Sequence, residues 1–196
     1  MIARTAMSQP DFMPRNLLSI LNKVFNLALF NVLWISFVVG RYEWVWLSLP
    51  VLLVYLGFLL LRQIVRPMQL VLPAAIGIGT DSLFSLFGLF AFPTGTAAWY
   101  TAQPGLLPFW FILLWIAFAT TLTQSLRFLA DKLLLTMLAG ALAFPFNYWV
   151  GSQLGGISFP RGNLLTFATL SITWAILLPA MFKSLQLKTR PSNDKL

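Results

Sequence analysis

Long apolar stretches separated by short polar segments dominate the chain. They cover residues 17–40, 46–61, 69–92, 106–128, 133–150 and 164–182. An α-helix rises 1.5 Å per residue, so about 20 apolar residues cross the roughly 30 Å hydrocarbon core of a bilayer. The pattern therefore predicts an all-α bundle of about six transmembrane helices. The second stretch is short, with Pro50 near its start, where proline is tolerated because the first helical N–H has no partner within the helix.

The pieces between these stretches are too short to hold a soluble domain. We therefore expect one transmembrane domain, residues 15–187, preceded by a flexible cytoplasmic leader, residues 1–14, and followed by a cytoplasmic tail, residues 188–196. Two prolines, Pro145 and Pro179, interrupt the last two stretches. Each removes a backbone donor and crowds the preceding turn, so a kink is predicted at both.

Composition and charge agree with a membrane protein. Hydrophobic residues make up 59% of the chain and charged residues 9%, against roughly a quarter charged in soluble domains. In a six-span arrangement, only Arg41 and Arg161 fall on one side. The other basic residues all fall on the opposite side: Arg4, Arg15, Lys23, Arg62, Arg66, Arg127, Lys132, Lys183, Lys188, Arg190 and Lys195. Because basic residues in short loops favour the cytoplasmic side, both termini are predicted to be cytoplasmic.

Aromatic residues gather where this topology places the outer interface. Trp and Tyr are enriched at the surfaces of membranes, where their rings lie at the level of the headgroups. The residues concerned are Trp44, Trp46, Trp99, Tyr100, Tyr148 and Trp149.

Several kinds of chemistry are not expected. The formal charge of +8 is spread over several loops and the tail and does not form one patch, so topology and anionic lipids explain it better than nucleic acid does. The chain has no Cys and no His, which removes disulfides, thiol chemistry and the usual metal ligands. There is no phosphate loop, carboxylate pair or Ser-His-Asp set, so catalytic residues stay unknown and a protein that is not an enzyme is favoured, with no metal and no cofactor predicted.

Asp81 is the acidic residue that lies in the middle of an apolar stretch. An ionisable group at membrane depth is costly and usually faces a protein interior or a polar cavity. Together with other polar residues at helical spacing, it predicts an intramembrane polar pocket. The predicted pocket residues are Thr80, Asp81, Ser82, Ser85, Thr120, Thr121, Gln124 and Asn147. Helix packing is the favoured explanation of the small and hydroxyl-bearing residues, and a structural Asp81 paired with Thr121 or Gln124 is the alternative to a functional one.

Several local motifs resemble those of a known family. They include Gly79-Thr80-Asp81-Ser82-Leu83, Leu107-Pro108-Phe109-Trp110, Phe118-Ala119-Thr120-Thr121-Leu122, Ser125-Leu126-Arg127-Phe128-Leu129, Gln153-Leu154-Gly155 and Thr173-Trp174-Ala175, with Gly140, Pro145, Tyr148, Gly151 and Pro179 between and after them. On these motifs the chain resembles a family of small, uncharacterised bacterial inner-membrane proteins, classed as a domain of unknown function. The resemblance implies a multi-pass protein of the bacterial inner, or cytoplasmic, membrane.

The resemblance also implies a genomic context, and this chain departs from the similar proteins at one position. Genes of similar proteins often lie near cyclopropane-fatty-acid-synthase-like and flavin-oxidoreductase-like genes, which implies membrane lipid modification or an envelope stress response. Where this chain has Gln124, similar proteins commonly have His before the Ser-Leu pair. Glutamine keeps the hydrogen bonding but does not titrate, so proton or metal chemistry at that position is not expected here.

Three functions remain open. The favoured one is an accessory factor in membrane lipid modification, whose partners are membrane lipids and a membrane or peripheral lipid-modifying enzyme. The second is a small proton-coupled transporter or flippase, working as a homodimer, with Asp81 as the coupling acid. The third is a structural membrane scaffold, in which Asp81 only specifies helix packing.

Overall fold

The computed structural model describes residues 15–93 and 105–187, and within them the protein is all-α. The helices are α1 (Arg15–Ile35), a π-helical turn η1 (Ser36–Gly40), α2 (Arg41–Leu61), α3 (Pro67–Leu86), α4 (Phe109–Thr123), a 3₁₀ turn η2 (Arg127–Leu129), α5 (Leu133–Gln153) and α6 (Asn163–Leu187). The predicted leader and tail, and the aromatic residues Trp99 and Tyr100, lie outside the described residues.

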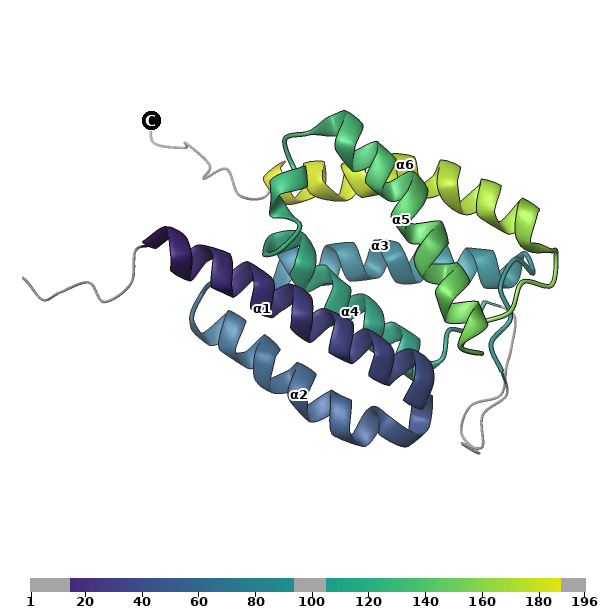
Figure 1. Ribbon diagram of the computed structural model, residues 1–196, viewed down its shortest axis with the longest axis horizontal. Helices are drawn as coiled ribbons and strands as arrows, with labels where there is room; N and C mark the ends of the chain where they lie inside the picture. Colours follow the sequence, from purple (N-terminus) through teal and green to yellow (C-terminus); the bar gives the residue numbers. More distant parts are fainter. Residues whose placement is uncertain (1–14, 94–104, 188–196) are drawn as a thin grey trace, which may run out of the picture.

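Four helical segments of the described chain are long and apolar enough to cross a membrane. They are Leu17–Leu61, Pro67–Leu86, Leu133–Gln153 and Asn163–Leu185. The first has 45 residues, and as a straight helix would be about 68 Å long. Instead it reverses at η1, so that α1 and α2 run in opposite directions (Figure 1). Asn26 of α1 donates a hydrogen bond to the hydroxyl of Tyr55 on α2, 2.9 Å away.

Helix α4 lies at the centre of the bundle, in contact with α1, α2 and α3, while α5 packs along α6 (Figure 1). Nine of its residues are buried, as expected of a helix that is apolar all round. It is shorter than the predicted stretch 106–128. Pro108 precedes it, and at the other end the N–H of Ser125 donates to the side chain of Asn26 at 3.3 Å. At 15 residues it is about 22 Å long, and the six predicted spans therefore stay a prediction.

The other helix ends also differ from the sequence pattern. Helix α2 begins at Arg41, which places Pro50 inside the helix and not at its start. Helix α3 ends at Leu86, short of the apolar residues up to 92. Gly88 has a φ of 69°, a conformation that glycine adopts without strain, and Ala91 then pairs with Ser158 through backbone hydrogen bonds of 3.0 and 2.8 Å.

Helices α5 and α6 continue through Pro145 and Pro179. Both prolines lie inside the helices, as the sequence indicated, and the kinks themselves stay a prediction. The two helices approach closely at Gly140, where a Cβ atom would overlap the backbone carbonyl of Trp174. Glycine at this position allows the contact, as small residues do at membrane helix interfaces.

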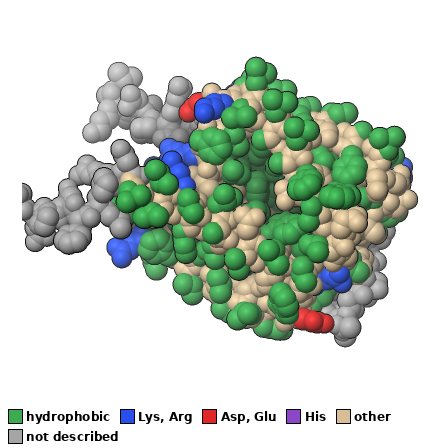
Figure 2. All heavy atoms as spheres, viewed as in Figure 1, with side chains coloured by type: hydrophobic (Ala, Val, Ile, Leu, Met, Phe, Trp, Pro, Cys, Tyr) green, Lys and Arg blue, Asp and Glu red, His purple; other side chains and the backbone are tan. Residues whose placement is uncertain are grey.

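The outer surface of the helices is apolar. Leu61, Trp46 and Leu164 are exposed by 85%, 78% and 85%. Figure 2 shows apolar side chains over most of one face, with the Lys, Arg, Asp and Glu side chains near its edges. Such a surface suits lipid better than water, because an exposed apolar patch of this extent is unusual on a soluble monomer.

Candidate functional site

Asp81 is completely buried, where α3, α4 and α5 meet. Its side chain is 0% exposed, and one oxygen, Oδ2, accepts two hydrogen bonds. The donors are the indole Nε1 of Trp115 on α4, at 2.8 Å, and the hydroxyl of Tyr148 on α5, at 2.6 Å. The other oxygen, Oδ1, is buried and has no hydrogen-bond partner among the described residues. Asp81 thus joins three helices through one oxygen atom.

Neighbouring residues make room for this contact. Gly77 lies one helical turn before Asp81, and a Cβ atom there would overlap the ring of Trp115. The Trp115 ring stacks on Trp174 of α6, with centroids 5.2 Å apart, and Trp174 stacks in turn on Phe144 of α5 at 4.2 Å. These contacts fix the indole so that its N–H points at the carboxyl group.

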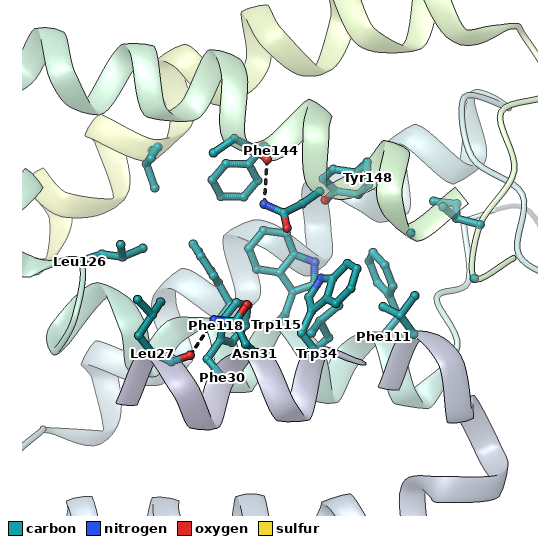
Figure 3. Close-up of a pocket in the computed structure, with 18 of the residues that line it drawn as sticks. Leu27, Phe30, Asn31, Trp34, Phe111, Trp115, Phe118, Leu126, Phe144 and Tyr148 are labelled. Carbon is teal, nitrogen blue, oxygen red and sulfur yellow. Dashed lines mark hydrogen bonds between the residues drawn. The ribbon is translucent and has the colours of Figure 1, made fainter. Parts of the chain in front are cut away.

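A cavity of about 290 Å³ lies between α1 and α5, with α4 at its base. Its volume is near the lower end of the range for small-molecule sites. Figure 2 shows it as a hollow near the centre of the face, and Figure 3 shows aromatic rings of α1, α4 and α5 around it. The principal lining residues are Phe30, Trp34, Phe111, Trp115, Phe144 and Tyr148. We call this cavity the α1–α5 groove.

The groove and the Asp81 cluster share two residues. Trp115 and Tyr148 line the groove, and both donate to Asp81. Asp81 itself does not line it. The carboxyl group therefore holds two side chains of the groove wall from behind.

Two amides interrupt the apolar lining, one on each side of the groove. Asn31 belongs to α1 and Asn147 to α5. The Nδ2 of each donates to the backbone carbonyl four residues earlier, Leu27 for Asn31 and Ala143 for Asn147, both at 2.8 Å.

A second buried polar cluster surrounds Asn26, which is 1% exposed. Its Nδ2 donates to Tyr55 and to the hydroxyl of Thr120, at 2.9 and 3.0 Å. Its Oδ1 accepts from the hydroxyl of Ser125 at 2.7 Å. The cluster joins α1, α2 and the C-terminal end of α4, and it does not include Asp81.

The structure distributes the predicted pocket residues over several places. Asn147 lines the groove, Asp81 lies behind its wall, and Thr120 belongs to the Asn26 cluster. The remaining positions are as follows: Thr80 and Thr121 donate to the carbonyls of Ile76 and Phe118, Ser82 is half-buried on α3, Ser85 accepts from the N–H of Gly105, and Gln124 caps α4. The side chains that bond to Asp81 are Trp115 and Tyr148, in place of the expected Thr121 or Gln124.

Sequence reasoning missed several residues of these sites, among them Tyr148, Trp115, Asn26 and Asn31. Tyr148 was expected in the outer aromatic belt, but it is buried and bonds to Asp81. Trp115 carries no signal in an apolar helix, because tryptophan is also an ordinary core residue. Asn26 and Asn31, in contrast, do carry a sequence signal. Amide side chains within an apolar stretch need hydrogen-bond partners for the same reason as Asp81, although an unpartnered amide costs less free energy than a charged carboxylate.

The described residues contain no group of three or more His, Cys, Asp or Glu side chains that could hold a metal ion. The groups that the site offers for chemistry are an aromatic cavity, two amides, and a carboxyl group that accepts hydrogen bonds from two side chains.

The four membrane-length segments and the apolar surface indicate a multi-pass membrane protein. Residues 23–180 match the family model described as "Protein of unknown function (DUF2878)". The match covers most of the chain, and the protein belongs to this family. Searches of curated proteins and of solved structures found no match.

Proposed function

We propose that this protein binds the acyl chain of a membrane lipid in the α1–α5 groove and acts as an accessory factor in membrane lipid modification. The observation that carries the proposal is the groove itself, an aromatic-lined cavity of about 290 Å³ between membrane-length helices. Burial of apolar surface is the dominant favourable contribution that such a lining offers a ligand.

The surroundings of the groove support a lipid as the occupant. Val32 and Leu142 stand next to the lining residues Asn31 and Ala143, and they are exposed by 63% and 69%. In a membrane these side chains contact hydrocarbon, so the molecules available at the mouth of the groove are lipids. The genomic context implied by the sequence resemblance agrees with lipid modification, in a bacterial inner membrane and with a separate enzyme as partner.

Photocrosslinking tests the binding step. The full-length protein is reconstituted in phosphatidylcholine bilayers that contain a diacylglycerol with a diazirine in one acyl chain, and crosslinked peptides are identified by mass spectrometry. We expect crosslinks concentrated on α1, α4 and α5 residues of the groove. Ala143→Phe, which fills the groove, should reduce them several-fold, and Ala75→Phe, on an exposed face of α3, should not. Crosslinks spread evenly over the exposed helices and insensitive to Ala143→Phe would refute the proposal.

A lipidome comparison tests the role in lipid modification. Deletion strains are rescued with the wild type, with Ala143→Phe or with Ala75→Phe at matched expression. If the proposal holds, deletion changes acyl-chain composition, and only Ala143→Phe fails to restore it. Identical lipidomes in all strains under lipid-modifying and envelope-stress conditions would exclude this role.

One observation favours proton-coupled transport or lipid flipping as a second candidate. The Oδ1 atom of Asp81 is buried with no hydrogen-bond partner among the described residues, as expected where a carboxyl group gains and loses a proton. This candidate predicts pH-dependent movement of a fluorescent phosphatidylcholine across proteoliposomes, lost in a folded Asp81→Asn variant. Rates equal to those of protein-free liposomes at every pH would exclude it.

A further inference from the structure

The two amides of the α1–α5 groove have a common geometry. Asn31 and Asn147 line the cavity from helices on opposite sides. Each directs its Nδ2 along its own helix, to the carbonyl of Leu27 or Ala143, and both distances are 2.8 Å. Because only the N–H side of an amide donates, these contacts define which way each amide group is turned.

The geometry leaves one acceptor atom on each amide. With Nδ2 on the backbone carbonyl, Oδ1 lies on the other branch of each amide. Figure 3 shows Asn31 bonded to Leu27 with its amide beside the groove. Within the described part of the chain, no hydrogen bond to the Oδ1 of either residue is present. Both asparagines are exposed at the wall of the groove, so in a membrane their Oδ1 atoms face apolar surroundings, where the partner that stabilises them is a donor.

The lining also defines the charge of that partner. No Lys, Arg, Asp or Glu is among the residues that line the groove. A phosphate or carboxylate would find no cation there and would face two carbonyl oxygens, which bear partial negative charge. A neutral group with an O–H fits both conditions, since it donates to an amide oxygen without adding a charge to a low-dielectric site.

We propose that the lipid bound in the α1–α5 groove is uncharged and carries a free hydroxyl group, which donates a hydrogen bond to Asn31 or Asn147. This inference rests on the proposed function, because it names the class of lipid that the groove selects. The hydroxyl lies between the two amides and the hydrocarbon chain along the aromatic wall formed by Phe111, Trp115 and Phe144.

The test uses two probes with the same hydrocarbon chain, one of which carries a methyl group in place of the donor hydrogen. Radiolabelled oleyl alcohol and oleyl methyl ether have the same chain, and the ether cannot donate. Binding to the full-length protein is measured in phosphatidylcholine nanodiscs, with empty nanodiscs as background. One hydrogen bond corresponds to about a three- to tenfold preference for the alcohol in the wild type. Oleate, with its negative charge, should bind more weakly than the alcohol.

Two variants test whether the amides cause the preference for the alcohol over the ether. In Asn31→Leu/Asn147→Leu the alcohol-to-ether ratio should fall to about one while ether binding is retained. Asn22→Leu, an exposed asparagine of α1 outside the groove, should keep the wild-type ratio. If the double variant does not fold, the wild-type ratio decides alone, and a ratio of one overturns the inference.

Different results would overturn the hydroxyl inference and the proposal of groove binding. Equal binding of alcohol and ether, both abolished by Ala143→Phe, would leave acyl-chain binding intact and overturn the hydroxyl inference. Binding of neither probe above empty nanodiscs, or binding unaffected by Ala143→Phe, would overturn groove binding and the inference with it.

Discussion

At the residue scale, the most consequential group is the Asp81 carboxyl. One of its oxygens accepts hydrogen bonds from both the indole N–H of Trp115 and the hydroxyl of Tyr148, and both of these side chains are buried. Without the carboxyl oxygen these two donors would have no partner at that position, and a buried donor without a partner is costly. The role of Asp81 in shaping the groove thus follows from what it accepts, whether or not it also exchanges a proton.

Asp81→Ala should therefore destabilise the protein strongly. Each donor left without a partner costs about 1–3 kcal/mol, so we expect the free energy of unfolding to fall by about 2–6 kcal/mol. Asp81→Asn keeps the acceptor oxygen but places an NH2 donor where Oδ1 has no partner, so it should lose about 1–3 kcal/mol, less than Asp81→Ala. Unfolding in mixed micelles, followed by Trp fluorescence, measures both, with Ser82→Ala as the control. Equal stability of Asp81→Ala and the wild type would mean that these hydrogen bonds contribute nothing.

The burial of Asp81 in the protein interior could be predicted from the sequence, but its partners could not. A carboxyl group within an apolar stretch can be recognised from the local sequence alone, and such a group usually faces the protein interior. The choice of Trp115 and Tyr148 depends on how three helices pack, including the space left by Gly77. Thr121 and Gln124 were chemically reasonable partners. However, Thr121 bonds to its own helix at Phe118 and Gln124 lies where α4 ends.

At the scale of elements, the α5–α6 pair depends on a close approach at Gly140. A Cβ atom at this position would overlap the carbonyl of Trp174, and backbone cannot move as a flexible side chain does. We expect Gly140→Ala to lower the free energy of unfolding by about 1–3 kcal/mol, as overpacking does. Gly79→Ala meets no atom within 4 Å and should raise it by roughly 0.5–1 kcal/mol. If both substitutions change stability alike, the helices are not in close contact at Gly140.

The Asn26 cluster makes a separate prediction. Asn26→Leu removes the hydrogen bonds to Tyr55, Thr120 and Ser125 that join α1, α2 and α4. Interhelical hydrogen bonds in membrane proteins average about 0.6 kcal/mol, so a loss of about 1–3 kcal/mol is expected. Hydrogen exchange at the C-terminal end of α4 should also become faster. Asn22→Leu, exposed on the same helix, is the matched control, and equal exchange in the two variants would contradict the assignment.

The positions of the helices were easier to predict than their ends. Apolar length located the helices α1 to α6 of the described residues, because a long apolar stretch has few alternatives to helix in a membrane. The ends of α3 and α4 depend on single interactions that hydropathy does not register. Helix α3 stops before Gly88, which has a positive φ, and the end of α4 is turned by the bond between Ser125 and Asn26.

At the scale of the whole molecule, the topology is open to direct measurement. Figure 1 places the α2–α3 and α4–α5 connections at one end of the bundle and the α5–α6 connection at the other. The chain has no cysteine, so single cysteines can be introduced without background. With cytoplasmic termini, a membrane-impermeant maleimide added outside intact cells should label Arg161→Cys. Arg62→Cys and Lys132→Cys should react only after permeabilisation, and the reverse pattern would invert the predicted orientation.

The α1–α5 groove is hollowed into an apolar face of the helix bundle (Figure 2), and this has a consequence for how the affinity of a membrane-dissolved ligand is expressed. A ligand already dissolved in the bilayer reaches such a site by diffusing within one leaflet, not from bulk water. Its effective concentration is then a mole fraction among the surrounding lipids, and a dissociation constant in moles per litre would change with the amount of lipid in the tube. Occupancy should follow the number of ligand molecules per nanodisc and stay constant when the whole sample is diluted.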